Sequence, residues 1–356
     1  MSKSISPFEK SAKIPKDDKT LLAQNEITEK KEAEQVIVKK KDEVKIDELP
    51  GVGATTAEKL KEAGYTTLMS LAVASPGELV EVCAIGDAVA KKIINNARNK
   101  LDMGFESGED LLRKREQILK ISTGSRALDN LFGGGIESGG ITECYGQFGA
   151  GKSALAHQLA VNIQLPKEKG GADGMALWVD TENTFRPERI NQIAVAQGLD
   201  ATEVLKKIKV GRAFNSDHQT LMSEKIEELI RDQGLPIKLV IVDSLMSHFR
   251  VDFVGRGTLA DRQQKINKHM HTLLKLASTY NIVIYVTNQV MSKPDTFFGD
   301  PTEAIGGNIV AHNSTTRVYL RKGKKGSRVA KMVDSPYLPE SEAIFMITDK
   351  GIRDLE

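Results

Sequence analysis

Residues 146–153 read Gly-Gln-Phe-Gly-Ala-Gly-Lys-Ser, which is a complete phosphate-binding loop of the form G-x-x-x-x-G-K-[ST]. The spaced glycines let backbone N–H groups curl around a polyphosphate, and the following helix points its positive end at the same phosphates. In this pattern Lys152 reaches the β- and γ-phosphates, and the hydroxyl of Ser153 holds Mg²⁺. A strand-like run before the loop and a helical pattern at 154–159 disfavour the alternative of a simple glycine-rich turn. The candidate nucleotide-binding residues are therefore Gly146, Gln147, Phe148, Gly149, Ala150, Gly151, Lys152 and Ser153.

The length and composition limit the number of domains, the cellular compartment and the class of partner that we expect. Its 356 residues leave room for about two domains plus tails. No apolar run approaches the ~20 residues that span a bilayer, and no apolar signal segment opens the chain, so we expect a cytoplasmic protein without a membrane partner. Cys83 and Cys144 could form one disulfide, but a reducing compartment is the simpler interpretation. The net charge of +2 neither requires nor excludes nucleic acid, so such binding depends on local patches.

The chain divides into four segments. Residues 1–44 are rich in Lys, Glu and Asp, which predicts a disordered tail because such a segment buries too little apolar surface. Short helical patterns fill 45–102 and predict a small all-α domain. A connector follows at 103–122, with a helical pattern over 111–120, and the remaining residues 123–356 form the largest segment.

The segment 45–102 contains a glycine-rich hairpin between two helical patterns. It reads Leu-Pro-Gly-Val-Gly over 49–53, and a weaker echo follows at 82–93. Two such units resemble a helix-hairpin-helix domain, whose hairpin offers backbone N–H groups to a nucleic-acid phosphate without reading its sequence. Gly51 and Gly53 are the candidate DNA-binding residues here, and a helix–helix turn that serves packing alone is the alternative.

Strand and helix patterns alternate from residue 123 to the end. This alternation predicts an α/β fold with a mostly parallel sheet and helices on both faces. After residue 314, short β-branched runs with Gly/Lys turns predict an antiparallel extension of the sheet. The expected strands are 140–145, 175–180, 238–243 and 281–288, and the longest expected helices are 216–231 and 258–279.

Polar side chains follow three of these apolar strands, at the edge where open α/β sheets place ligands. Asp243 ends one strand and is the candidate second support of Mg²⁺. Glu182 follows another strand and is the candidate that orients or deprotonates the attacking water, with Asp180 as the alternative. Asn288 and Gln289 follow the third strand, where an amide could bond the γ-phosphate. For each of these residues, ordinary solvation of a strand end is the competing interpretation.

Several longer stretches occur in an order typical of RecA-type strand-exchange recombinases, and the chain resembles this family over roughly residues 45–356. The resemblance implies a RecA-like ATPase core behind a helix-hairpin-helix domain. It also implies an ATP-dependent recombinase that uses Mg²⁺, forms helical filaments on single-stranded DNA and pairs it with double-stranded DNA. The stretches that carry the resemblance are 180–190 (Asp-Thr-Glu-Asn-Thr-Phe-Arg-Pro-Glu-Arg-Ile), 248–250 (His-Phe-Arg), 255–259 (Gly-Arg-Gly-Thr-Leu), 262–265 (Arg-Gln-Gln-Lys), 287–291 (Thr-Asn-Gln-Val-Met) and 305–308 (Ile-Gly-Gly-Asn).

The resemblance also assigns roles to residues of this chain. It implies that Glu182 is the catalytic glutamate, that Gln289 senses the γ-phosphate and that Arg189 lies beside the adenine. It places DNA-binding loops at about 249–258 and 290–308. Nucleotide state can bias both loops because each follows a sheet strand on the ligand side. The implied DNA contacts are Arg250, Arg256, Arg262, Gly306, Gly307 and Asn308, with a solvated basic face as the alternative for the arginines.

Two further segments imply contacts between copies of the chain. Residues 334–340 resemble the segment that caps the nucleotide of a neighbouring subunit, with Asp334 and Pro339 as candidate contacts. Such a head-to-tail interface generates a filament when it does not close, and a ring when it does. Phe105 stands where the family has a Phe-x-x-Ala polymerisation motif, although Gly108 replaces the alanine. Packing of Phe105 back on its own domain is the alternative.

Two other functions share parts of this pattern. A non-catalytic recombination paralogue that loads the true recombinase often lacks the amino-terminal domain or the catalytic glutamate, and this chain has both. A hexameric helicase lacks the Gly-Arg-Gly stretch at 255–257 combined with the Gly-Gly-Asn stretch at 306–308. We therefore expect a recombinase, with mediators or paralogues as further partners. The basic hairpin at 321–328 could guide DNA, and a solvated turn explains it equally well.

Overall fold

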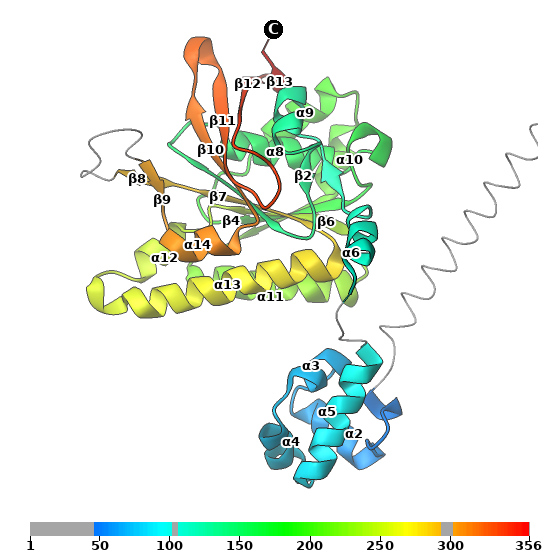
Figure 1. The fold of residues 1–356 in the computed structure, drawn as a ribbon. Helices are drawn as coiled ribbons and strands as arrows, with labels where there is room; N and C mark the ends of the chain where they lie inside the picture. Colours follow the sequence, from blue (N-terminus) through cyan, green and yellow to red (C-terminus); the bar gives the residue numbers. More distant parts are fainter. Residues whose placement is uncertain (1–45, 102–105, 293–301, 356) are drawn as a thin grey trace, which may run out of the picture. The chain divides into compact units, whose positions relative to one another are not determined.

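The computed structural model describes residues 46–101, 106–292 and 302–355 (Figure 1). The chain forms two compact units, one ending at Gly108 and the other beginning at Glu109. This division falls within the connector expected at 103–122. The tail expected at 1–44 and Phe105, the expected polymerisation residue, lie outside the described residues.

The first unit is a small helical domain with its own apolar core. Two of its helices begin with a capping box, in which Thr67 and Ser75 each bond the backbone N–H three residues ahead. Leu60, Leu71 and Ile93 are fully buried at its centre. Its elements are η1 (Ile46–Glu48), α2 (Ala54–Glu62), α3 (Leu68–Val73), α4 (Pro76–Cys83) and α5 (Asp87–Leu101).

The glycine-rich hairpin of this unit precedes α2. Val52 is buried in the core, while Gly51 and Gly53 on either side of it are exposed. Gly51 has a φ of +98°, a conformation that glycine adopts without strain. The side chain of Asn96 stabilises the turn by donating a hydrogen bond to the carbonyl of Pro50 at 2.6 Å. The exposed backbone leaves room for a phosphate, but the DNA contact at Gly51 and Gly53 stays a prediction.

The second unit is built on a nine-stranded sheet in the order β13-β12-β11-β10-β3-β7-β6-β4-β5. From β5 to β10 every pairing is parallel, and from β10 to β13 every pairing is antiparallel. The predicted α/β fold with a mostly parallel sheet and an antiparallel extension is therefore confirmed. The strands are β3 (Ile141–Gly146), β4 (Met175–Asp180), β5 (Ile208–Arg212), β6 (Ile237–Asp243), β7 (Val283–Asn288), β10 (Thr316–Lys322), β11 (Arg328–Asp334), β12 (Glu342–Thr348) and β13 (Gly351–Asp354).

Helices cover both faces of this sheet, as Figure 1 shows. On one face lie α8 (Lys152–Asn162), α9 (Pro187–Ala196) and α10 (Ala201–Lys206). On the other face lie α11 (Ser216–Arg231), α13 (Leu259–Tyr280) and α14 (Gly307–Asn313). The alternation of a strand explains both layers: in β4, Trp178 packs toward α8 and α9, while Leu177 and Val179 pack toward α11 and α13.

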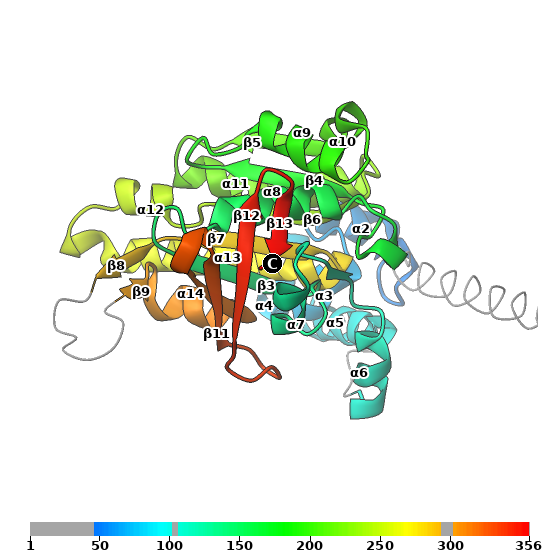
Figure 2. The same cartoon turned by 90° about the horizontal axis from the view of Figure 1, so that it is seen from above.

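Short elements join this framework to the functional edge. In both views, α12 (Ser247–Asp252) and the antiparallel pair β8 (Val290–Ser292) and β9 (Thr302–Ala304) extend from the same side of the unit (Figures 1 and 2). They follow β6 and β7, so the carboxyl ends of the parallel strands lead into them. The remaining elements of this unit are η2 (Lys167–Lys169), η3 (Arg256–Thr258) and η4 (Lys324–Gly326), together with the elements of the connector.

The connector differs from its sequence-based prediction. A helix was expected over 111–120, but α6 spans Gly108–Arg115, and Lys120–Ile121 forms strand β1 against β2 (Ile136–Glu137). The second half of the expected helix is therefore wrong. Its backbone finds partners outside a helix, since the N–H of Leu119 donates to the hydroxyl of Ser138 and the N–H of Ser138 donates back to the carbonyl of Leu119. The short helix α7 (Arg126–Leu131) follows β1.

Among the described residues, none of the helices combines the length and the apolar character that crossing a bilayer requires. Both cysteines are free and buried, so neither forms the disulfide that the sequence allowed. Cys144 lies in β3 two residues before the phosphate loop begins, and its burial raises the pKa of the thiol to about 12. The thiol is therefore protonated and unreactive near neutral pH.

Candidate active site

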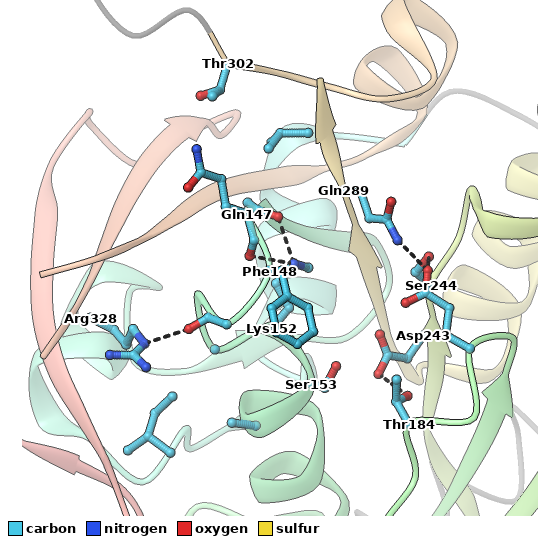
Figure 3. Close-up of a pocket in the computed structure, with 17 residues that line it drawn as sticks. Gln147, Phe148, Lys152, Ser153, Thr184, Asp243, Ser244, Gln289, Thr302 and Arg328 are labelled. Carbon is cyan, nitrogen blue, oxygen red and sulfur yellow. Dashed lines mark hydrogen bonds between the residues drawn. The ribbon is translucent and has the colours of Figure 1, made fainter. Parts of the chain in front are cut away.

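A cavity of about 640 Å³ opens at the carboxyl ends of the parallel strands. The loop between β3 and α8 forms one wall, and side chains that follow β4, β6 and β7 form the opposite wall (Figure 3). Every residue of the predicted loop lines the cavity except Ala150, which is buried beneath it. The cavity also brings together Glu182, Asp243 and Gln289, which stand far apart in the sequence.

Backbone geometry shapes the loop wall. A Cβ atom added to Gly146 would lie 2.1 Å from the carbonyl oxygen of Leu320 in β10, so only glycine fits there. Gly151 has a φ of +110° and forms the N-cap of α8. The free N–H groups of the first turn of α8 therefore point into the cavity, which is the arrangement that binds phosphates.

The ammonium of Lys152 lies against its own loop. It donates to the carbonyl of Gly146 at 2.8 Å and to the carbonyl of Gln147 at 3.1 Å. Burial lowers the pKa of Lys152, and the carboxylates of Asp243 and Glu182 partly oppose that shift. Phosphate oxygens would replace the two carbonyls as acceptors and would favour the charged amine.

Asp243 stands at the floor of the cavity with both carboxylate oxygens engaged. Thr184 donates its hydroxyl to one oxygen at 2.7 Å, and Thr287 donates to the other. The side chain is nearly completely buried, and Ser153 lines the same cavity. The two threonines fix the direction of the carboxylate, which suits a group that supports a metal ion from behind its first ligands.

Glu182 takes part in a chain of side-chain hydrogen bonds. Its Oε1 accepts from the hydroxyl of Ser244 at 2.9 Å and from the amide of Gln289 at 2.5 Å. The other end of that amide accepts from the guanidinium of Arg250 at 3.1 Å. One carboxylate that faces the cavity is thus linked through an amide to an arginine of α12.

Asp180, the alternative to Glu182, has a different task. Its carboxylate accepts three backbone N–H groups, from Glu182, Thr184 and Phe185, at 3.0–3.3 Å. It is buried and outside the cavity lining, so it shapes the loop that presents Glu182. Asn183 completes the turn with a φ of +56°, a left-handed conformation that asparagine tolerates better than most residues.

His157 connects the two walls, because it bonds the start of α8 and the segment that follows Glu182. Its Nδ1 lies 2.6 Å from the carbonyl of Ser153, and its Nε2 accepts the backbone N–H of Arg186 at 3.0 Å. These partners assign the proton of the neutral ring to Nδ1. The ring packs against Trp178 and Phe185, which also contact each other, and burial lowers its pKa.

Three other nucleotide-site candidates lie outside this cavity. Arg189 donates to the carbonyls of Thr348 and Asp349 at the β12–β13 turn, and burial lowers its pKa. Asp334 ends β11, and Pro339 lies in the following turn. The contacts of Arg189 with adenine, and of Asp334 and Pro339 with a neighbouring subunit's nucleotide, stay predictions.

The expected DNA-binding residues of this unit lie on α12, η3, α13 and the start of α14. Arg250 in α12 reaches Gln289, Arg256 begins η3, and Arg262 lies in the first turns of α13. Gly306 has a φ of +104° and is the N-cap of α14. Gly307 and Asn308 form the first positions of that helix. Gly108, the other expected polymerisation residue, begins α6 and is exposed.

Sequence reasoning missed several residues of the site, among them Thr184, Ser244 and Arg328. Thr184 and Ser244 hold Asp243 and Glu182, and neither carries a signal of its own beyond its place next to a strand end. Arg328 lines the cavity and donates to the carbonyl of Gly149 at 3.0 Å. The sequence assigned it to a basic hairpin, because nothing local shows that β11 passes the phosphate loop.

Comparison with protein families agrees with this geometry. The Rad51 family model matches residues 114–355, which is most of the chain. The chain belongs to the Rad51 family. A second model, the SAM-like helix-hairpin-helix tandem, matches residues 44–99. Membership in the Rad51 family implies an ATP-dependent recombinase that acts on DNA, and the two matches together account for both compact units.

Proposed function

We propose that this Rad51-family chain forms helical filaments on single-stranded DNA and catalyses homologous pairing and strand exchange in recombinational repair. Within this family we propose a recombinase of the archaeal RadA kind. The observation that carries the proposal is the hydrogen-bond chain from Glu182 through Gln289 to Arg250. It links the nucleotide cavity to both expected DNA segments, since Arg250 lies in α12 and Gln289 directly precedes β8.

ATP and Mg²⁺ fit the residues that are present. The glycine cradle leaves room for phosphates where a Cβ would collide. Ser153 offers an oxygen ligand of the kind that Mg²⁺ prefers, and Asp243 lines the same cavity as an oriented carboxylate that would support the ion from behind its first ligands. In the described residues no group of three His, Cys, Asp or Glu side chains could hold a metal ion. Ser153 and the phosphates of the nucleotide would hold the ion, with Asp243 supporting it from behind. When bound, Mg²⁺ neutralises charge on the β- and γ-phosphate oxygens.

Hydrolysis is phosphoryl transfer to water. Lys152 and the N–H groups at the start of α8 bind the phosphates, and Asp243 stays oriented by its two threonines. Glu182 orients the attacking water and accepts its proton, because its carboxylate faces the cavity and is not committed to a metal-supporting position. Gln289 releases Glu182 when it turns to a γ-phosphate, so the presence of ATP changes what Arg250 contacts.

Self-assembly completes the proposal. Head-to-tail contacts through Phe105 and Gly108 of one copy would place Asp334 and Pro339 beside the nucleotide of the next, giving a filament or a closed ring. DNA is held through its backbone, so base pairing between strands and not the protein reads the sequence. We place the protein in the cytoplasm, on the chromosome, with mediators or paralogues as further partners.

The test is strand exchange between a single strand and a homologous duplex in the presence of ATP and Mg²⁺. Wild type is expected to give homology-dependent product, and Lys152→Ala to give none, because the amine that meets the phosphates is lost. Lys206→Ala is the matched control, since that lysine is exposed on α10 and pairs only with Glu203 on the surface. Absence of product from wild type, with ATP binding intact, would instead indicate an adaptor that loads another recombinase.

A further inference from the structure

A buried polar cluster lies beneath the cavity and is not part of its lining. It consists of Glu143 in β3, Asn288 in β7 and Arg317 in β10, which are three neighbouring strands. Glu143 and Asn288 are fully buried, and the side chain of Arg317 is only 15% exposed. A buried ion pair contributes little to stability relative to apolar packing. The pair of Glu143 and Arg317 therefore suggests a role other than stabilising the fold.

Glu143 is held from both sides. One carboxylate oxygen accepts the Nε–H of Arg317 at 2.7 Å, and the other accepts the amide of Asn288 at 2.8 Å. The guanidinium of Arg317 also lies over the ring of Tyr145, 5.2 Å from its centre. The carboxylate therefore fixes which way the amide of Asn288 points.

Asn288 in turn holds two backbone groups from different segments. Its amide donates to the carbonyl of Ile305 at 2.6 Å, and its carbonyl oxygen accepts the N–H of Gln289 at 2.8 Å. The N–H of Ile305 bonds the carbonyl of Gln289 at 3.0 Å. Ile305 lies between β9 and Gly306, so it is the base of the second expected DNA segment. The buried side chain of Asn288 therefore connects Gln289, which faces the cavity, to Ile305 at the base of the second expected DNA segment.

We propose that Asn288, oriented by Glu143 and Arg317, is the positioning residue through which nucleotide state sets DNA affinity. The inference rests on the proposed function and deepens it. When Gln289 shifts toward a γ-phosphate, Asn288 and the backbone pair make Ile305 follow. Without the amide of Asn288, Gln289 can move while the carbonyl of Ile305 stays in place. The coupling between nucleotide binding and DNA binding then weakens. Asn288 itself touches neither nucleotide nor DNA in this role.

The test uses full-length protein and a fluorescein-labelled oligo-dT strand. Fluorescence anisotropy gives the DNA Kd with Mg²⁺ and a non-hydrolysable ATP analogue, and again with Mg²⁺ and ADP. The ratio of the two Kd values measures the coupling. In Asn288→Ala we expect this ratio to fall about 10-fold toward one. The affinity for the ATP analogue itself should stay within about 3-fold of wild type, because Asn288 does not line the cavity.

Asn162→Ala is the matched control. Asn162 is also a buried asparagine, and its amide also donates to a backbone carbonyl, that of Ser122, at 2.7 Å. It lies at the end of α8, outside the cavity lining. Both substitutions remove a buried amide clamp, so a loss of stability alone would change the coupling ratio equally in both. Only Asn288→Ala should change it.

A folded Asn288→Ala protein with the wild-type ratio would overturn the inference and leave the proposed function intact. A wild-type ratio near one would overturn the proposed function, and the inference with it. If Asn288→Ala does not fold, Glu143→Gln decides, since it keeps the volume but removes the carboxylate that orients the amide. We expect it to lower the ratio about 3-fold, and an unchanged ratio in that variant would overturn the inference.

Discussion

The two walls of the nucleotide cavity are held in different ways. The loop wall depends on the main chain: Gly146 has no room for a Cβ, and both Lys152 and Arg328 donate to carbonyls of the loop. The opposite wall depends on side chains, with Glu182 bonded to Ser244 and Gln289. Because a backbone wall needs no rearrangement to bind phosphate, it suits tight binding. A wall of side-chain bonds can exchange partners, and so it suits reporting which nucleotide is present.

The difference leads to opposite expectations for mutations. On the loop wall, added volume should be the most harmful change, since main-chain atoms cannot move aside cheaply. On the side-chain wall, changes that conserve volume and alter only chemistry should matter most. The following predictions test this contrast in order of expected effect.

Gly146→Ala should be the most severe change for nucleotide binding. The new Cβ would lie 2.1 Å from the carbonyl oxygen of Leu320, so the loop or β10 must shift. We expect nucleotide affinity to fall at least about 100-fold, or about 3 kcal/mol, in a titration with a fluorescent ATP analogue. Gly198→Ala is the control, because its Cβ would meet no atom within 4 Å although its φ is +72°. Near wild-type affinity in Gly146→Ala would show that the wall is not held by the backbone.

Glu182→Gln should separate binding from chemistry on the other wall. The amide keeps the volume and can still meet Ser244 and Gln289, so ATP affinity should stay within about 3-fold of wild type. Hydrolysis should fall by about 10²–10⁴-fold, because the carboxylate that takes the proton from water is gone. Single-turnover hydrolysis and nucleotide titration on the same sample measure both. Glu188→Gln, at an exposed position of α9, is the control, and normal turnover in Glu182→Gln would refute the assignment.

The same contrast explains how much the sequence could predict. The loop wall is eight contiguous residues, so its pattern identifies both its geometry and its ligand. The central strands are short apolar runs, and 175–180 coincides with β4 as observed. The side-chain wall was found only as separate strand-end residues. Its bonds join positions 62, 107 and 39 apart in the chain, and no local pattern encodes which of them meet.

Errors arose where tertiary partners decide local structure. The apolar pattern at 111–120 fits a helix, yet Ile121 is fully buried by pairing β1 with β2. Position at the strand end left Asn288 and Gln289 as equal candidates, and only the family resemblance selected Gln289. In the structure the alternation of a strand buries Asn288 and turns Gln289 toward the cavity. The burial of Asn288 depends on residues of β3, β10 and the segment after β9. A local sequence pattern does not specify that these three segments come together.

Arg250→Gln tests whether the side-chain wall reaches DNA. The substitution removes a cation that bonds Gln289 and is expected to contact a DNA phosphate. We expect single-strand affinity to fall several-fold, and the slope of log K against log salt to become shallower by about 0.7, as for one lost phosphate contact. ATP affinity without DNA should stay within about 3-fold of wild type, because Arg250 does not line the cavity. Arg231→Gln, at the end of α11, is the control, and an unchanged salt slope in Arg250→Gln would remove Arg250 from the DNA contacts.

The smallest expected effect on activity concerns His157, the histidine that contacts both walls. Burial lowers the pKa of His157, and it lowers that of His269 to about 4. Both rings stay neutral in the folded protein at pH values where the unfolded chain, with histidine pKa values near ~6.5, already binds protons. The unfolded state then holds more protons, so stability is present above pH ~6.5 and is lost as pH falls below it.

For His269 the loss approaches about 3 kcal/mol by pH ~4, since each pKa unit corresponds to about 1.4 kcal/mol. Urea unfolding between pH 7 and pH 4 would measure the slope, and His269→Gln and His157→Gln should each reduce it. Only His157→Gln should also lower ATPase activity, because its ring alone bonds Ser153 and Arg186 across the cavity floor. If the two variants lowered the activity equally, the two walls would not be joined through His157.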